Sequence, residues 1–332
     1  MSSAIPSITV VIPAYNAAET IEVCMAALTR QTTSRERYEV ILVDDGSTDR
    51  TPELAAQLGA SVIAQAHTGR AAARNRGIDA ARGALVLFTD ADCEPAGDWV
   101  EQMVTPLLDP NVTGVKGVYR TRQKSLTARF VQIEYEDRYD HAAQSRYIDF
   151  VDTYAAAYRR TALVAVGGFD PTLPFDEDQE LSFRLAEAGH KLVFNPLAAV
   201  YHRHPESWAR YAQRKVQIGY WKTRVLKLHP SKAWRDTHTP WNLKFQVTLA
   251  GLSALLALLS SWVGALHWLL GLLLAAFVVS GASFVKKAWR RDRPVAWFAL
   301  PALCLRAWAL GLGFVGGYAS AIVRHRQPGG LP

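Results

Sequence analysis

Two aspartates, Asp90 and Asp92, follow the apolar run at residues 84–89 and are separated by a single residue. Two carboxylates on one turn at the end of a strand can bind a hard cation such as Mg²⁺ or Mn²⁺ and, through it, a diphosphate. The same acids could instead be turn and cap residues before a helix near Trp99. Their position after a run with the composition of a buried strand favours the interpretation as a metal site.

A second acidic pair, Asp44 and Asp45, follows another apolar run and opens the segment Asp44–Asp49. Acids and serines here could cap the helix that Pro52 opens. One side chain is enough for a cap, however, so two adjacent acids before a glycine exceed that need. The functional interpretation is a carboxylate that accepts a hydrogen bond from a nucleotide base or a ribose hydroxyl.

Four acids occupy five positions between Asp176 and Glu180, just before or within a predicted helix that Gly189 would end. Acids in a first turn also suit the helix dipole, so a structural role is a real alternative. Carboxylates this crowded repel one another, which raises the pKa of one of them and suits a general base.

Arginines follow a glycine in the segment Gly69–Gly77, and Arg70 and Arg74 lie one helical turn apart. A helix N-terminus and guanidinium groups can both meet a phosphate, although surface arginines on helices are common. His202 follows the last predicted strand. Its imidazole is either a metal ligand or a structural side chain.

These candidate residues need a scaffold, and the first 200 residues supply the pattern for one. Short β-branched runs alternate with amphipathic stretches, which predicts an α/β domain with a mostly parallel sheet and flanking helices. Near-continuous apolar strands indicate a sheet covered on both faces. Ligands of such sheets bind at the carboxyl ends of the strands, where the acids lie. The predicted strands are residues 8–12, 39–43, 61–64, 84–89, 112–119 and 197–201, and the predicted helices are 18–29, 51–58, 69–81, 126–147, 180–189 and 207–228.

Several function classes are excluded or disfavoured. No glycine-rich dinucleotide or P-loop motif follows the first strand, which argues against dinucleotide-dependent redox enzymes and P-loop hydrolases. The three cysteines have no spacing typical of a metal site or disulfide framework. A net charge of +7 could suit nucleic acid, but that requires a basic face on the folded domain, so we expect no nucleic-acid partner.

The positive charge is concentrated near the C-terminus. Residues 1–239 contain 28 Lys or Arg and 29 Asp or Glu, whereas residues 240–332 contain 9 Lys or Arg and one acid. The stretches 243–262 and 264–285 are apolar and about 20 residues long, enough to cross a hydrocarbon core. The cluster Lys286–Arg293 follows and is typical of a cytoplasmic loop.

The segment 205–242 carries tryptophans and basic residues at helical spacing, with Lys215 interrupting the apolar series. A basic amphipathic helix of this kind is typical of a membrane interface, and a helix packed on the domain surface is the alternative. We therefore divide the chain into a catalytic domain at 1–204, an interfacial region at 205–242 and a membrane domain at 243–332.

The last apolar segment, 295–323, contains Arg306 and is too short for two crossings. One crossing would place Arg306 near the membrane centre, which is costly. We predict two spans, with 295–323 forming a bent in-plane or re-entrant segment that is broken near Pro301 and packed beside the catalytic domain. Glycines that would permit close helix contact there are Gly311, Gly313, Gly316 and Gly317.

Taken together, six segments resemble the family 2 glycosyltransferases of the GT-A fold. The resemblance runs over Ile8–His204 and rests on the order of its motifs. They are VVIPAYNAAETI at Val10–Ile21, VDDGSTD at Val43–Asp49, GRAAARNRGI at Gly69–Ile78, FTDADCEP at Phe88–Pro95, GGFD at Gly167–Asp170 and FDEDQELSFRLAEAGH at Phe175–His190.

The resemblance implies a role for each matching residue. Asp90 and Asp92 match the motif that holds a divalent cation, Mn²⁺ or Mg²⁺, on the donor diphosphate, and Asp178 matches the base of inverting members. His202 matches an additional metal ligand found in some members. The residues expected to bind the nucleotide sugar, linked to UDP or GDP, are Pro13, Tyr15, Glu19, Asp45, Arg70, Arg74 and Asp90.

The expected function is metal-dependent, inverting transfer of one sugar to a membrane lipid-linked acceptor, in cell-envelope glycan or glycolipid synthesis. Processive members carry a Q-x-x-R-W motif, whereas Gln217–Trp221 has tyrosine in place of the arginine. Two alternatives stay open: transfer to a polyprenyl phosphate, and a non-catalytic membrane scaffold. The resemblance and the basic cluster together place the protein at the cytoplasmic membrane, with the catalytic domain in the cytoplasm and membrane lipids as partners.

Overall fold

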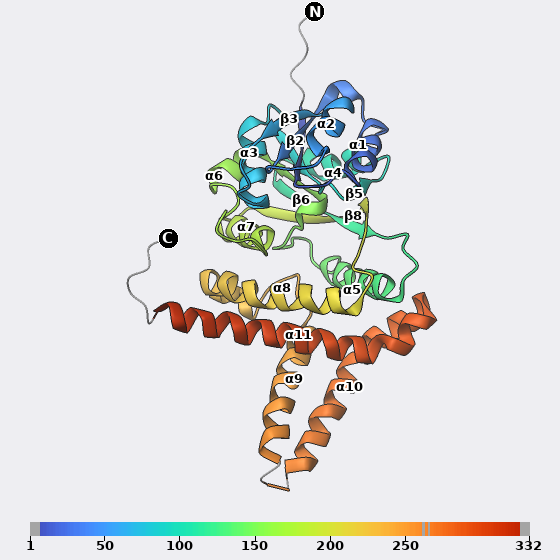
Figure 1. The fold of residues 1–332 in the computed structure, drawn as a ribbon, viewed down its shortest axis with the longest axis vertical. Coiled ribbons are helices and arrows are strands. Elements are labelled where there is room, and N and C mark those ends of the chain that lie inside the picture. Colours follow the sequence, from blue (N-terminus) through green and yellow to red (C-terminus); the bar gives the residue numbers. More distant parts are fainter. Residues whose placement is uncertain (1–6, 261–262, 265, 326–332) are drawn as a thin grey trace, which may run out of the picture. The chain divides into compact units, whose positions relative to one another are not determined.

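The computed structural model describes residues 7–260, 263–264 and 266–325 (Figure 1). They form two compact units, which we call the sheet unit and the helical unit. The sheet unit contains the chain up to Arg122, Tyr139–Arg203 and Asp236–His238. The helical unit contains Gln123–Arg138, His204–Arg235 and the chain from Thr239 onward.

One eight-stranded sheet, in the order β3-β2-β1-β4-β7-β6-β8-β5, forms the centre of the sheet unit. The predicted α/β class, with a mostly parallel sheet, is confirmed. The strands are β1 (Ile8–Ala14), β2 (Tyr38–Asp44), β3 (Ser61–Ala64), β4 (Leu85–Phe88), β5 (Cys93–Pro95), β6 (Val112–Arg120), β7 (Ala156–Arg159) and β8 (Lys191–His202).

The sheet has a parallel half and a mixed half. Strands β3, β2, β1 and β4 are all parallel, with Val10 of β1 opposite Val40 of β2 and Leu87 of β4. Strand β7 then pairs antiparallel with both β4 and β6, and β5 pairs antiparallel with β8. The sequence analysis missed β7, because its residues Ala-Ala-Tyr-Arg lack the β-branched side chains that mark a strand.

Helices cover both faces of the sheet, as its continuous apolar strands predict. On one face Val11 and Phe88 pack with Ala73 and Leu181, which come from two covering helices. The helices of this unit are α1 (Ile21–Thr29), α2 (Thr51–Gln57), α3 (Arg70–Ala80), α4 (Trp99–Val104), α6 (Arg160–Ala165) and α7 (Glu177–Glu187), with short 3₁₀ helices η1 (Arg35–Arg37), η2 (Thr105–Leu108) and η3 (Thr153–Ala155).

Helices alone build the helical unit. Phe130, Tyr211, Phe284 and Leu303, one from each of four helices, share its core. The helices are α5 (Leu126–Ala142), of which the part up to Arg138 belongs here, α8 (Trp208–Leu228), η4 (Pro230–Ala233), α9 (Trp241–Ser260), α10 (Leu266–Arg291) and α11 (Arg293–His325). Residues 123–138 thus pack with the C-terminal helices, whereas the sequence analysis drew one boundary at 204.

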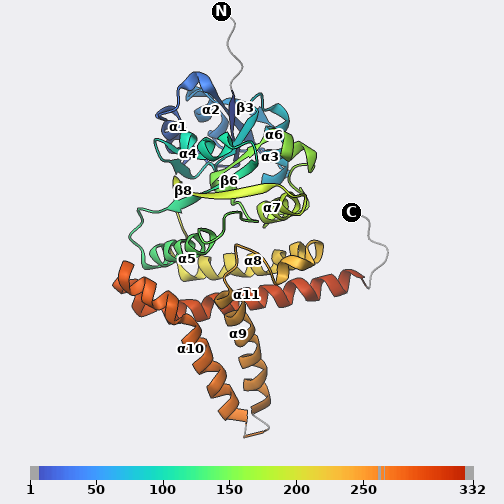
Figure 2. The same cartoon turned by 180° about the vertical axis from the view of Figure 1, so that it is seen from behind.

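Within the helical unit, α9 and α10 lie side by side as a hairpin and α11 runs across it (Figures 1 and 2). All three are long and apolar enough to cross a membrane by length and composition. The predicted spans correspond to α9 and α10, although Ser261 and Trp262 lie outside the described residues. The predicted break near Pro301 is wrong, because α11 continues through this proline from Arg293 to His325.

Glycines allow α11 to pack closely against α8. Two of the four glycines predicted to permit such contact, Gly313 and Gly317, do so. A Cβ on Gly313 would lie 2.2 Å from the carbonyl oxygen of Val216, and one on Gly317 would lie 2.4 Å from Thr223 Oγ1. By contrast, Gly311 has open space around the position of a Cβ. The crossing of the two helices therefore depends on small residues at specific places.

Candidate active site

The candidate residues of the sheet unit lie at the carboxyl ends of neighbouring parallel strands. Pro13 is in β1, Asp45 follows β2 and Asp90 follows β4. Because β1 pairs with both β2 and β4, these three ends share one edge of the sheet. This is the position predicted from the strand pattern.

Asp45 holds the loop that leads into α3. Its carboxylate accepts hydrogen bonds from the backbone N–H of Thr68 and of Gly69, each at 2.9 Å, and from Gln65 Nε2 at 2.7 Å. Burial would raise the pKa of Asp45, but these hydrogen bonds hold it below its ordinary value. Asp45 is therefore an ionised group that fixes residues 65–69 beside this edge of the sheet.

Tyr15 and His67 form the outer wall of this edge. Their rings lie 4.1 Å apart at a tilt of 31°, and both side chains are exposed. His67 Nδ1 also lies 2.9 Å from Asp45 Oδ2, so the same carboxylate orients the histidine. An exposed aromatic pair provides a surface on which a base can stack. Glu19 lies exposed just before α1.

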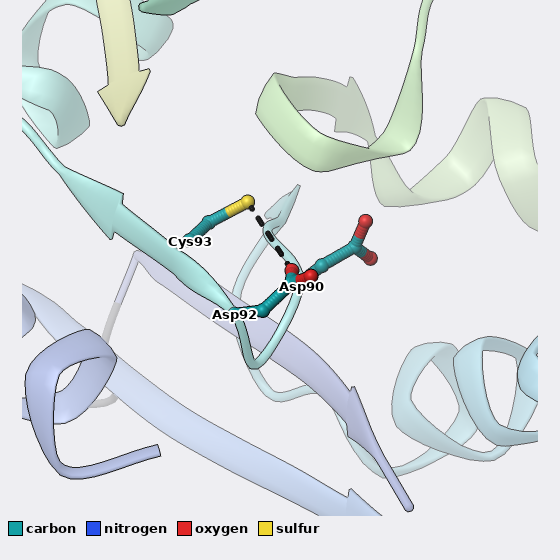
Figure 3. Close-up of side chains that lie close together, drawn as sticks. All are labelled: Asp90, Asp92 and Cys93. Atoms are coloured by element: carbon teal, nitrogen blue, oxygen red, sulfur yellow. Dashed lines mark hydrogen bonds between the residues drawn. The ribbon is translucent and has the colours of Figure 1, made fainter. Parts of the chain in front are cut away.

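Asp90, Asp92 and Cys93 form the group in which a metal ion could be held (Figure 3). Their potential ligand atoms all lie within 4.8 Å of one another. His202, at the end of β8, is buried and places Nε2 at 3.3 Å from Asp92 Oδ2. Carboxylate oxygens with an imidazole nitrogen form a donor set that fits Mn²⁺ or Mg²⁺.

Cys93 is the member of this group that the sequence analysis did not include. Its Sγ lies 3.8 Å from Asp92 Oδ1, and the Asp90 side chain points away from it (Figure 3). Burial, followed by the charges of Asp90 and Asp92, raises the pKa of the Cys93 thiol well above its ordinary value. Cys93 therefore stays a thiol that donates to Asp92, and the oxygen atoms are the better ligands.

Arg74 joins the metal-site turn to the first turn of α7. The side chain is buried, with Nη2 at 2.9 Å from Asp90 Oδ1 and Nη1 at 2.7 Å from Glu177 Oε1. Burial alone would lower the pKa of Arg74, yet Asp90, Glu177 and Asp178 keep it above its ordinary value. Arg74 thus holds two carboxylates in position.

Arg70, one turn before Arg74, has a different environment. Its side chain is 47% exposed and its Nε lies 3.7 Å from Glu177 Oε1. The guanidinium group also lies over the ring of Phe175, 5.0 Å from its centre. Of the two arginines, Arg70 is the one whose side chain is exposed.

Asp178 lies in the first turn of α7, beside Glu177. Burial raises its pKa well above the ordinary value, and the negative charges of Glu177 and Asp152 add to that effect. Crowding of acids was the predicted cause, but burial contributes more. A carboxylate that retains its proton into a higher pH range suits proton transfer near neutral pH.

Asp152 is a site residue that the sequence did not reveal. It forms a buried ion pair with Lys116 of β6, and its carboxylate also accepts from the Tyr154 hydroxyl at 3.3 Å. The ring of Tyr119 stacks between Tyr154 and the metal-site residue His202, with centroids 3.2 and 4.5 Å away. This aromatic stack connects the two sides of the site, and no local pattern marks it.

Comparison with known proteins gives a consistent result. The glycosyl transferase family 2 model matches residues 9–167. Glycosyltransferase AglE of Haloferax volcanii is 33% identical over 207 residues, which are 58% of this chain and 66% of that protein. The pre-mycofactocin glycosyltransferase of Mycobacterium tuberculosis is 32% identical over 235 residues, which are 68% of this chain and 48% of that protein. The chain thus spans less than two thirds of the length of either relative.

Among solved structures, mannosyltransferase PcManGT from Pyrobaculum calidifontis, in complex with GDP-Man and Mn²⁺, has a TM-score of 0.59 at 22% identity. The similarity covers 97% of this chain and 88% of that chain. At this level of identity the similarity shows a shared fold, the GT-A fold with C-terminal helices.

Proposed function

Since this chain belongs to the family 2 glycosyltransferases, we propose that it moves one sugar from a nucleotide-sugar donor to a lipid-linked acceptor at the membrane. One observation carries the proposal. The buried Arg74 contacts both Asp90, in the metal-site turn, and Glu177, the neighbour of Asp178. A diphosphate-binding group and a proton acceptor are thereby held in one rigid arrangement.

Asp178 is the proposed general base. It takes the proton from the acceptor hydroxyl while that oxygen bonds to the anomeric carbon, and the bond from this carbon to the diphosphate oxygen breaks. Attack opposite the leaving group inverts the anomeric centre. The raised pKa of Asp178 matches the proton affinity that this step requires.

Asp90 and Asp92 are the proposed cation ligands, with His202 as a further ligand beside Asp92. A bound divalent cation would neutralise charge on the departing nucleoside diphosphate. Mn²⁺ is the first ion to test, since PcManGT was solved with it.

The nucleotide is proposed to lie along the edge formed by Pro13, Tyr15 and the loop that Asp45 orders. Tyr15 and His67 offer stacking surface, and Arg70 offers an exposed guanidinium group to the diphosphate. Glu19 lies in the exposed turn before α1, and any contact that it makes with the nucleotide would come from that turn. Both UDP and GDP donors fit these contacts.

The acceptor is proposed to be lipid-linked because the chain carries its own membrane attachment. Helices α9 and α10 have the length and composition of spans. Lys286, Lys287, Arg290 and Arg291 lie at the end of α10, and the positive-inside rule places that end in the cytoplasm. A hairpin of two membrane spans begins and ends on the same side of the membrane. The sheet unit precedes the α9–α10 hairpin in the chain, so it would be cytoplasmic too.

The test is a screen of the purified protein against UDP- and GDP-linked sugars, read as thermal stabilisation with Mn²⁺. A stabilising donor is then supplied with membrane lipid extract, and transfer of its radiolabelled sugar into lipid is followed. Transfer that the Asp178→Asn variant cannot perform supports the proposal. Transfer to a phosphate would favour the polyprenyl-phosphate alternative, and no stabilisation by any donor would favour the scaffold.

A further inference from the structure

Helix α11 has the hydropathy of a third span, yet its partners within the helical unit include two charged helices, α5 and α8. Resting on the proposed membrane attachment, we infer that α11 does not cross the membrane and instead binds the lipid surface through one apolar face. The face consists of the ten exposed residues between Pro294 and Ala319, none of which is charged. They are Pro294, Trp297, Phe298, Pro301, Cys304, Trp308, Leu312, Val315, Tyr318 and Ala319.

The start of α11 is fixed to α5. Arg129 donates to Asp292, the residue just before α11, through both Nε (2.6 Å) and Nη2. Two weaker ion pairs join α5 to the end of α10, Lys287 with Asp137 at 3.9 Å and Arg291 with Glu136 at 4.0 Å. The part of α5 in this unit contains too many charges to lie in hydrocarbon.

The middle of α11 is fixed by a buried ionic cluster. Arg306 Nη1 lies 3.1 Å from Glu134 Oε1 of α5, and Arg306 Nη2 donates to Gln246 Oε1 of α9 at 2.7 Å. The other oxygen of Glu134 accepts from the Tyr211 hydroxyl of α8 at 3.0 Å. Arg306, which would lie near the centre of a spanning helix, therefore pairs with an acid of a polar helix.

Lys215 of α8 completes this cluster, 3.1 Å from Glu134. Although burial opposes ionisation, Lys215 and Arg306 lower the pKa of Glu134 to about 2, so the acid is charged. The lysine that interrupts the apolar series of α8 thus points inward to an acid that is 81 positions away in the sequence.

The last part of α11 is fixed to α8. Besides the glycine contacts, the Tyr220 hydroxyl lies 3.0 Å from Ser320 Oγ. Helix α8 carries six basic residues, Arg210, Arg214, Lys215, Lys222, Arg224 and Lys227. A helix with six cations lies at a membrane surface and does not cross it. The start, the middle and the end of α11 thus all contact polar helices, α5 or α8, which cannot lie in the hydrocarbon core.

The apolar face of α11 points away from α5 and α8. Figures 1 and 2 show α8 on one side of α11 and the α9–α10 hairpin leaving from the other side. Trp297 is 73% exposed and Val315 is 68% exposed. Tryptophan and tyrosine prefer the membrane interface, so a lipid surface is the partner that fits.

Cys304 allows a direct test, because it is exposed on this face while Cys24 and Cys93 are buried. A span would carry Cys304 about 16 Å from its start, near the bilayer centre. An in-plane helix would hold it about 5–10 Å below the headgroup boundary. The two topologies therefore differ in the depth of one native side chain.

The full-length protein is labelled at Cys304 with a nitrobenzoxadiazole maleimide and reconstituted in 3:1 phosphatidylethanolamine–phosphatidylglycerol vesicles. Depth is measured with lipids that carry quenchers at different acyl positions. The matched control is Cys304→Ser with Leu252→Cys, which places the label in the middle of α9 on an exposed position.

We expect a shallow Cys304 and a deep Leu252 position. If both labels are deep, α11 spans the membrane and this inference is overturned, while the proposed attachment stands. If the Leu252 position is itself not embedded, the proposed attachment fails and the inference fails with it.

Discussion

Replacing Arg74 should strongly destabilise the sheet unit, because Arg74→Met would leave Glu177 charged and buried. The side chains of Arg74 and Glu177 are only 2% and 4% exposed. Removing one partner of a buried pair costs about 3–5 kcal/mol, since the other charge stays in a medium that solvates it poorly. For a unit of this size, that corresponds to a fall in melting temperature of roughly 6–20 °C.

Arg70 provides a matched control on the same helix and against the same carboxylate. Its side chain is 47% exposed and its contact with Glu177 is longer, at 3.7 Å. An exposed pair contributes about 0–1 kcal/mol, so Arg70→Met should melt within about 4 °C of the wild type. Both variants lose one positive charge and gain the same side chain, which leaves burial and the additional ion pair of Arg74 with Asp90 as the differences.

Melting curves of the full-length wild type, the two single variants and the double variant Arg74→Met/Glu177→Gln provide the assay. The double variant should recover about 1–3 kcal/mol relative to Arg74→Met, because it removes the uncompensated charge. If Arg74→Met melted no lower than Arg70→Met, Arg74 would not hold the two turns together and our account of the site would be wrong.

The further predictions concern three acids, Asp92, Asp178 and Asp45. Asp92→Ala should abolish turnover and Mn²⁺-dependent donor binding, measured by transfer assay and by calorimetry, and full wild-type activity in EDTA would contradict this. Asp178→Asn should still bind donor but lose at least about 10²-fold in kcat. Because the raised pKa of Asp178 favours its neutral form in the folded state, the associated stability is present at low pH and is lost as pH rises through the raised pKa. Asp178→Asn should therefore melt above wild type at pH 8 and close to it at pH 4, whereas equal shifts at both pH values would contradict this. Asp45→Asn should weaken donor binding by loosening residues 65–69, which hydrogen exchange of the Thr68 and Gly69 amides would report.

Much of the fold was predictable because its signals are local. The strands β1, β2 and β4 are apolar runs, and acids follow β2 and β4, so the sequence predicts both the strands and the edge where the acids meet. Strand β7 was missed because alanines pack tightly in the centre of a sheet without showing strand propensity. Gly189, with φ of +85°, confirms the predicted end of α7.

The contacts between site residues were not predictable, because they join distant parts of the chain. Arg74 and Glu177 are 103 positions apart, and nothing near either residue marks its partner. For the same reason Arg74 was assigned to the donor phosphate, whereas its guanidinium group is occupied by two acids of the protein. The sequence does give an indirect sign of such pairs. Arg74 lies in an alanine-rich helix and Glu177 precedes an apolar helix face, and a charged side chain that is buried in such a place needs a partner of opposite charge.

A surplus of negative charge relates the proposed metal site to the proposed base. Asp90, Glu177 and Asp178 lie near Arg74, and Asp92 lies near Asp90. The buried guanidinium group of Arg74 does not balance all four acids. Burial raises the pKa of Asp178, and the surplus raises it further, since another negative charge beside Glu177 is unfavourable. It also makes the turn at Asp90 and Asp92 attractive to a cation, because two carboxylates there share only one ion pair with Arg74. The charge that tunes the base and the charge that recruits the cation therefore have one origin, and Arg74 limits both.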